Sequence, residues 1–172
     1  GAYCAITPER ENYYLSWQTG KTFKFDIDDQ GNVVGKTRID PIGGSGYLFI
    51  NPFILDPLTH NSMFLSAGRF IWRNDSLDAI PIIGDEYNAI SQGWDRINES
   101  SVGGALGNPR ISAVGMSPAD NSVLYYGSSI GDVYRLDSVN AVDVDNITRT
   151  TLLDSIDGYV SSVVVNPLDA DE

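Results

Sequence analysis

Cysteine, histidine and positive charge are all scarce in this chain of 172 residues. Cys4 is the only cysteine, so no disulfide can form within the chain. It falls in an apolar stretch, where we expect a small buried hydrophobic residue. A reactive thiol is disfavoured, because the sequence places no histidine or basic cluster near Cys4.

His60 is the only histidine, and the sequence contains no G-x-S-x-G elbow. Ser-His-Asp chemistry within the chain is therefore excluded. There is also no P-loop, no G-x-G-x-x-G and no Cys/His zinc pattern. We accordingly expect no cofactor.

Eleven lysines and arginines stand against 23 aspartates and glutamates, which gives a formal net charge of −12. Such a surface repels phosphate backbones and anionic lipid headgroups, so nucleic acid is not expected as a partner. No apolar run approaches the roughly 20 residues that a membrane span needs, and we expect no membrane insertion. The chain begins at Gly1 without an apolar leader, so we expect any targeting segment to be removed or to lie outside it.

Glycine and proline, by contrast, are plentiful, with 17 and 8 residues spread along the chain. Aromatic and β-branched residues fill the intervals, a composition typical of an all-β protein. Four apolar runs end in a proline-containing turn, at Pro8, Pro57, Pro118 and Pro167. A second apolar run and a glycine-containing turn follow each of the first three prolines. This spacing indicates an internal repeat.

A third run follows each glycine turn and reads as an aromatic residue, a basic residue, a variable residue and an aspartate. The three copies begin at Phe23, Trp72 and Tyr134 and end at Asp26, Asp75 and Asp137. Each copy stands at nearly the same distance from its proline. We therefore interpret these prolines, aromatic residues and aspartates as the positions that define a structural repeat.

Each repeat predicts three strands joined by tight turns, with room for a fourth. A meander of this size cannot bury its own faces, so the repeats must stack on one another. The sequence thus predicts an all-β fold, a β-propeller of about three blades of antiparallel four-stranded sheet. We expect one blade at residues 2–46, a second at 47–108 with an insertion at 77–93, and a third at 109–158. Residues 159–172 are expected to be the first strand of the next blade.

Three blades and one strand are an incomplete part of a larger ring, because propellers usually have four to eight blades. We therefore expect the remaining blades as partners. They would come from another chain, from another copy of this one, or from parent sequence outside it.

The repeat resembles that of the Asp-box (BNR) β-propellers, a superfamily that includes sialidases, sortilin-like receptor domains and xyloglucan-active glycoside hydrolases. The resemblance is best at Ser117-Pro118-Ala119-Asp120-Asn121 and the strands that follow it, and Trp94-Asp95-Arg96-Ile97 is similar to the tryptophan segment that closes such a repeat. The Asp boxes are degenerate, since Asp26, Asp75 and Asp137 each lack the serine two positions before and the glycine two positions after. The resemblance implies a propeller, and a secreted or cell-surface protein.

Two stretches are candidate sites. Asp26 and Asp28 alternate before Gly31 as cation ligands can, although the loop departs from an EF-hand. The favoured alternative is a hairpin turn in which Gly31 and Asn32 adopt positive φ. Arg110 stands where a sialidase-like enzyme could hold a carboxylate-binding arginine, and the alternative is a surface arginine at the start of a strand.

These observations favour a non-catalytic recognition or scaffold propeller that binds a glycan or a protein partner. The alternative is a glycoside hydrolase of the Asp-box type, with its catalytic carboxylates partly outside this chain. With 23 acidic residues available, composition identifies no catalytic pair.

Overall fold

The structure, a computed structural model, describes residues 3–8, 10–103, 108–154 and 157–171. In these residues it contains twelve β-strands, four single-turn 3₁₀ helices and no α-helix. The strands form three antiparallel four-stranded sheets, each in simple chain order. The first sheet holds β1 (Cys4–Ile6), β2 (Tyr13–Ser16), β3 (Thr22–Ile27) and β4 (Val33–Arg38). The second holds β5 (Phe53–Leu55), β6 (Met63–Ala67), β7 (Phe70–Asn74) and β8 (Trp94–Ile97). The third holds β9 (Ile111–Ser117), β10 (Asp120–Ser128), β11 (Val133–Asp137) and β12 (Thr148–Leu153).

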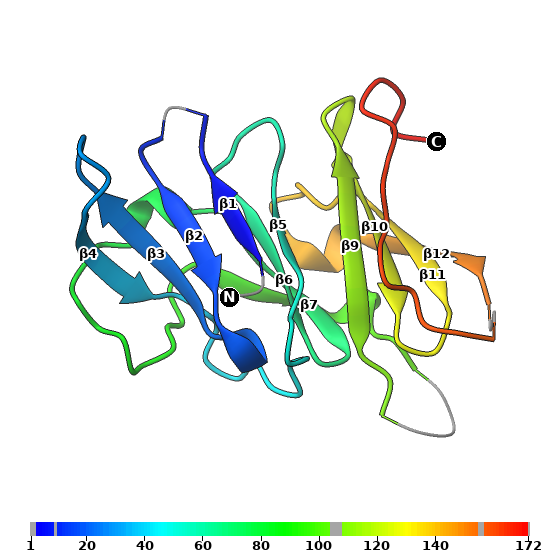
Figure 1. Ribbon diagram of the computed structural model, residues 1–172. Coiled ribbons are helices and arrows are strands. Elements are labelled where there is room, and N and C mark those ends of the chain that lie inside the picture. Colours follow the sequence, from blue (N-terminus) through cyan, green and yellow to red (C-terminus); the bar gives the residue numbers. More distant parts are fainter. Residues whose placement is uncertain (1–2, 9, 104–107, 155–156, 172) are drawn as a thin grey trace.

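The sheets stand face to face in the order of the chain, with the second between the first and the third (Figure 1). The all-β, propeller-like arrangement of three four-stranded blades confirms the predicted fold class. The turns β1–β2, β5–β6 and β9–β10 lie at one edge of the stack (Figure 1). The described sheets do not close into a ring.

Two separate cores fill the spaces between the sheets. Tyr14 and Ala5 of the first sheet meet Phe53, Leu65 and Trp94 of the second. The other core joins the second sheet to the third, and its largest members are Phe64, Ile71, Leu124, Tyr126 and Tyr134. The second sheet is therefore buried on both faces, as a middle blade must be, and stacking supplies most of the apolar burial.

The three sheets share one register. Four residues before each of the first three prolines stand Cys4, Phe53 and Val114, which pair with Leu15, Leu65 and Tyr126 of the second strands. Those residues pair in turn with the repeat aromatics Phe23, Trp72 and Tyr134 of the third strands. Equivalent positions can therefore be compared residue by residue between blades.

The insertion at 77–93 folds back along β4, the last strand of the first sheet. The Arg38 N–H donates to the carbonyl of Asp85 (2.7 Å), and the Ile83 N–H donates to Thr37 Oγ1 (2.7 Å). Pro41 and Ile90 form an isolated parallel bridge. These bonds cover an edge strand that would otherwise expose unpaired backbone groups.

The prediction that Cys4 is buried is wrong, because the structure exposes its thiol. Side chains alternate along β1, and Ala5 takes the position that packs against the second sheet. Cys4 and Ile6 therefore point to the opposite face, where no described sheet stacks.

Residues 157–171, the C-terminal segment, contain no assigned strand. The segment runs beside β9 (Figure 1), and the Val160 N–H donates to the carbonyl of Ser128 at 3.2 Å. That it is the first strand of another blade stays a prediction. The expected limits at residues 2 and 172 lie outside the described residues. No helix in the described part of the chain is long and apolar enough to cross a membrane.

Candidate functional site

The turn between β2 and β3, residues 17–21, borders a cavity of about 400 Å³. Trp17, Gln18, Thr19 and Lys21 line it. This volume falls within the ~300–1,000 Å³ of typical small-molecule sites. We call this region the Trp17 turn.

Trp17 is the apolar part of the site. It continues the alternation of Tyr13 and Leu15 along β2, so it lies on the face of the first sheet that points away from the second. Its ring packs on Phe23 with centroids 4.8 Å apart, and Lys36 Nζ lies 5.5 Å from the ring centroid. Trp17 nevertheless remains 47% exposed. An aromatic ring that packs on a neighbour and keeps about half of its surface exposed can contact a ligand with an apolar face.

The backbone of the turn is closed and strained. The Trp17 N–H donates to the carbonyl of Lys21 (2.7 Å), and the Thr19 N–H donates to the carbonyl of Phe49 (3.1 Å). Thr19 has φ 60° and ψ 37°, a left-handed conformation that β-branched residues rarely adopt. Such strain costs about 1–3 kcal/mol and concentrates at functional sites.

Tyr47, from the connection between the first two sheets, supports the turn from behind. A Cβ placed on Gly20 would lie 2.1 Å from Tyr47 Cδ1, and one on Gly44 would lie 1.9 Å from its hydroxyl oxygen. Only glycine at positions 20 and 44 leaves room for the Tyr47 ring, and Gly20 also has φ 80°. The Tyr47 hydroxyl has no hydrogen-bond partner among the described residues, and burial raises its pKa.

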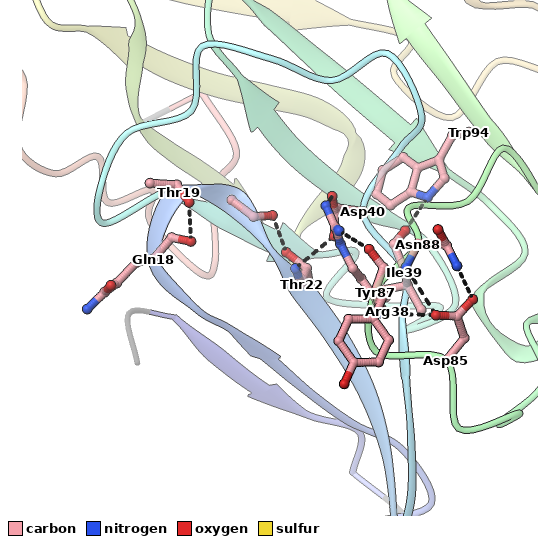
Figure 2. A network of polar contacts seen from close by, with 11 residues as sticks. Gln18, Thr19, Thr22, Arg38, Ile39, Asp40, Asp85, Tyr87, Asn88 and Trp94 are labelled. Carbon is pink, nitrogen blue, oxygen red and sulfur yellow. Dashed lines mark hydrogen bonds and ion pairs between the residues drawn. The ribbon is translucent and has the colours of Figure 1, made fainter.

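A partly buried ion pair anchors the ends of the strands next to the turn (Figure 2). Arg38 Nε and Nη2 donate to the two carboxylate oxygens of Asp40 at 2.7 and 2.8 Å. Asp40 Oδ1 also accepts the Thr22 N–H at 3.2 Å, and this bond fixes the start of β3. The bonds to Asp40 raise the pKa of Arg38. Bidentate pairs of this kind are geometrically specific, so the turn rests on a rigid base.

The third sheet closes the equivalent turn with the same backbone hydrogen bond but with different side chains. Its residues 128–132 close with the Ser128 N–H donating to the carbonyl of Asp132 (2.9 Å), and Gly131 has φ 95° where Gly20 has 80°. Ser128 and Asp132 are buried and bond to each other. The first blade shares the closing bond and the positive-φ glycine of this turn, but it differs at Thr19, whose counterpart Ile130 does not have positive φ. It also presents an indole, an amide, a hydroxyl and an ammonium group in place of the buried Ser128 and Asp132.

Comparisons with protein-family models and with curated proteins find no match. The resemblance to Asp-box propellers therefore stays a prediction. What the site can do has to be argued from its own residues.

The predicted repeat residues do not gather into one constellation. Asp26 lies within β3, Asp75 follows β7, and Asp137 ends β11, each in its own sheet. Asp75 and Asp137 bind the arginine two residues before them, with Nε–Oδ distances of 2.8 Å for Arg73 and 2.7 Å for Arg135. Burial raises the pKa of Asp75, and Arg73 opposes that shift.

Asp28, the second cation-ligand candidate, serves its own turn. Its Oδ1 accepts the N–H groups of Gln30 (2.9 Å) and Asn32 (2.8 Å), and the bonds from Asn32 lower its pKa. Gly31 has φ 85° as predicted, but the prediction of positive φ at Asn32 is wrong, because Asn32 does not have positive φ. Its side-chain amide donates to the Asp28 carboxylate (3.1 Å). In the described ranges no three His, Cys, Asp or Glu side chains could hold a metal ion.

Arg110, the candidate carboxylate-binding arginine, donates from Nη1 to the carbonyl of Tyr47 at 3.0 Å. It thus links the start of the third sheet to the connection behind the Trp17 turn. Sequence reasoning missed Trp17 itself. The available signal was a tryptophan directly after an apolar strand, followed by the polar turn Gln18-Thr19-Gly20-Lys21.

Proposed function

We propose that this chain belongs to a non-catalytic recognition propeller of a secreted or cell-surface protein, and that it binds a glycan at the Trp17 turn. The observation that carries the proposal is the half-exposed indole of Trp17, fixed against Phe23 beside a cavity of about 400 Å³.

A sugar ring suits this arrangement because it combines an apolar C–H face with a rim of hydroxyl groups. The face stacks on an indole, whose large rigid surface loses little conformational entropy on binding. Gln18, Thr19 and Lys21 supply donors and acceptors at the edge of the ring. Specificity would come from these few polar groups, as in other ligand sites.

The charge of the site favours acidic sugars. Lys21 lines the cavity and Lys36 lies over the indole, in a protein of net charge −12. Lys36 also binds Glu86 (2.9 Å), so part of its charge is neutralised. A carboxylate on the sugar would pair with the Lys21 ammonium group.

Recognition is favoured over hydrolysis by what lines the cavity. Glycosidases of the common type hold two carboxyl groups on either side of the scissile bond. Among the described residues, those that line this cavity carry an indole, an amide, a hydroxyl and an ammonium group. A glycoside hydrolase whose carboxylates lie partly outside this chain stays the alternative prediction, and turnover of polysaccharides or sialosides by the chain would establish it.

The test is a glycan array with neutral, uronic-acid and sialylated oligosaccharides, followed by titration calorimetry on the ligands found. We expect W17A to weaken binding by about tenfold or more, since a stacked aromatic contributes roughly 1–2 kcal/mol. W17F keeps Phe23 covered and should weaken binding less. Y87A is the matched control, because Tyr87 is 85% exposed and lies in the insertion. A blank array, or equal affinity in W17A and wild type, would refute the proposal.

A further inference from the structure

In the first two sheets, the basic residue of the third strand binds the backbone of the sheet that follows. Lys24 of β3 is buried, and its Nζ donates to the carbonyls of Leu77 (2.8 Å) and Ile80 (3.1 Å). Both carbonyls belong to the connection that leaves β7, the third strand of the second sheet. The lysine thereby joins the first blade to the second.

Arg73 of β7 repeats the contact one blade further on. Its Nη1 donates to the carbonyls of Val139 and Ala141, both at 2.7 Å, and the side chain is buried. These carbonyls belong to the connection that leaves β11, the third strand of the third sheet. Two successive junctions thus use the same contact, from a third-strand cation to the backbone of the next blade.

Arg135 is the equivalent cation of the third sheet. It directly follows Tyr134, which is buried in the core toward the second sheet, so Arg135 points to the opposite face. There it binds Asp137 (2.7 Å), Asp171 and the Tyr125 hydroxyl (3.1 Å). Within the described ranges no further sheet follows whose connection could receive it.

The C-terminal segment lies on that same face as a first strand would. Val163 stands four residues before Pro167, the position of Val114 in β9 and of Phe53 in β5. A Cβ on Gly115 would lie 3.0 Å from Val163, and one on Gly127 would lie 2.2 Å from Val160 Cγ1. Glycine at both positions lets the segment approach the third sheet closely.

Polar contacts hold the segment at residues 160 and 166. Ser112 Oγ donates to the carbonyl of Val160 (2.7 Å), and Ser117 Oγ donates to the carbonyl of Asn166 (2.6 Å). Val165 is buried whereas Val164 is 88% exposed, an alternation typical of a strand covered on one face. In the described part of the chain, however, residues 160–165 belong to no assigned sheet.

We propose that residues 160–166 and Arg135 form a docking surface for the three remaining strands of a fourth blade built on the same repeat. The edge strand of that partner pairs with residues 160–166, as β10 pairs with β9. The connection after its third strand presents backbone carbonyls to Arg135, which releases Asp171. Backbone pairing at an open strand supplies affinity, and the cation fixes the register.

The chain itself provides a partner for the test. Residues 1–166 are extended by a second copy of residues 118–153, so that the added strands follow Asn166 as β10–β12 follow Ser117. The added copy then carries the same carbonyls that Arg73 binds in the natural junction. A control extension has proline in place of the added residues equivalent to Leu124 and Tyr126, which prevents pairing.

We expect amide exchange at residues 161–165 to slow by roughly tenfold or more in the extended protein, relative to the unextended chain and the proline control. We also expect R135M to lower the urea midpoint of the extended protein as much as R73M does, and to lower that of the unextended chain by less than half as much. The proposal is overturned if amide exchange at residues 161–165 is as fast in the extended protein as in the unextended chain, whether or not the added strands fold. The added strands are copies of strands that fold against β9, so they should also fold against residues 160–166 if these act as a first strand. An equal R135M shift in both proteins also overturns it. Glycan binding at the Trp17 turn is measured separately, so the two proposals fail independently.

Discussion

Arg73 should contribute more to stability than any exposed arginine of this protein, and R73M measures that contribution. Its side chain is buried between the second and third sheets, where Nη1 donates to the carbonyls of Val139 and Ala141. Nε pairs with Asp75 at 2.8 Å. Methionine keeps most of the aliphatic volume but removes every donor, so both carbonyls lose their partner.

The size of the effect follows from the two short bonds. A hydrogen bond to a charged group contributes about 1.5–3 kcal/mol, and an unsatisfied buried acceptor adds a desolvation cost. The pair with Asp75 adds less, because the Asp75 side chain is 44% exposed to solvent. From the two bonds to Val139 and Ala141 we expect R73M to lower the free energy of unfolding by roughly 3–5 kcal/mol.

Urea unfolding followed by tryptophan fluorescence measures this change. If the free energy of unfolding falls by about 2 kcal/mol per molar urea, the urea midpoint should fall by about 2 M. R96M is the matched control, since Arg96 is exposed and lies 4.6 Å from the Phe70 ring, and we expect less than about 1 kcal/mol. R73K should recover part of the loss, because Lys24 makes the equivalent contact with an ammonium group. Equal midpoints for R73M and R96M would refute the idea that the third-strand cations join the blades.

Two further predictions concern the turns. T19G should raise the free energy of unfolding by about 1 kcal/mol, because glycine adopts φ 60° without strain. The same substitution should weaken glycan binding, because it removes the Thr19 hydroxyl. A lower thermal midpoint in T19G would show that Thr19 is not strained. D28N should reduce the loss of stability that the protein shows as the pH falls into the acid range. The folded pKa of Asp28 is lowered, so its stabilising effect is present above the unfolded pKa and is lost as pH falls through the folded one. Thermal midpoints of D28N and wild type should therefore converge as the pH falls below about 4, and a constant difference down to pH ~2 would contradict the assignment.

The strands were predictable because each blade repeats the same physical constraints. Proline and glycine mark the turns, and the aromatic residue of the third strand must cover the face toward the preceding blade. Trp72 and Tyr134 do so in the two cores. The register of the third strands could therefore be anticipated from spacing alone, without any relative for comparison.

Other features depend on which faces have neighbours, and spacing does not contain that information. Cys4 stands at the position equivalent to Phe53 and Val114, which are both covered by a preceding sheet. The first sheet has no described sheet on that side, so the same position is exposed. The course of the insertion along β4 also depends on long-range bonds, such as that between Arg38 and Asp85, that no local pattern encodes.

The stack of blades has a direction, and this explains why Trp17 stands where it does. Each third strand directs its aromatic residue backward and its cation forward, so the two ends of the stack differ in chemistry. At the forward end Arg135 binds acidic side chains and a tyrosine in place of a following blade. At the backward end Phe23 is fully buried although no described sheet covers it, because Trp17 packs on it instead. The equivalent of Trp17 is Ala67 in the second blade and Ser128 in the third, both small and buried. A preceding sheet covers those two positions, whereas Trp17 itself covers Phe23 and forms the outer surface of the first sheet within the described residues.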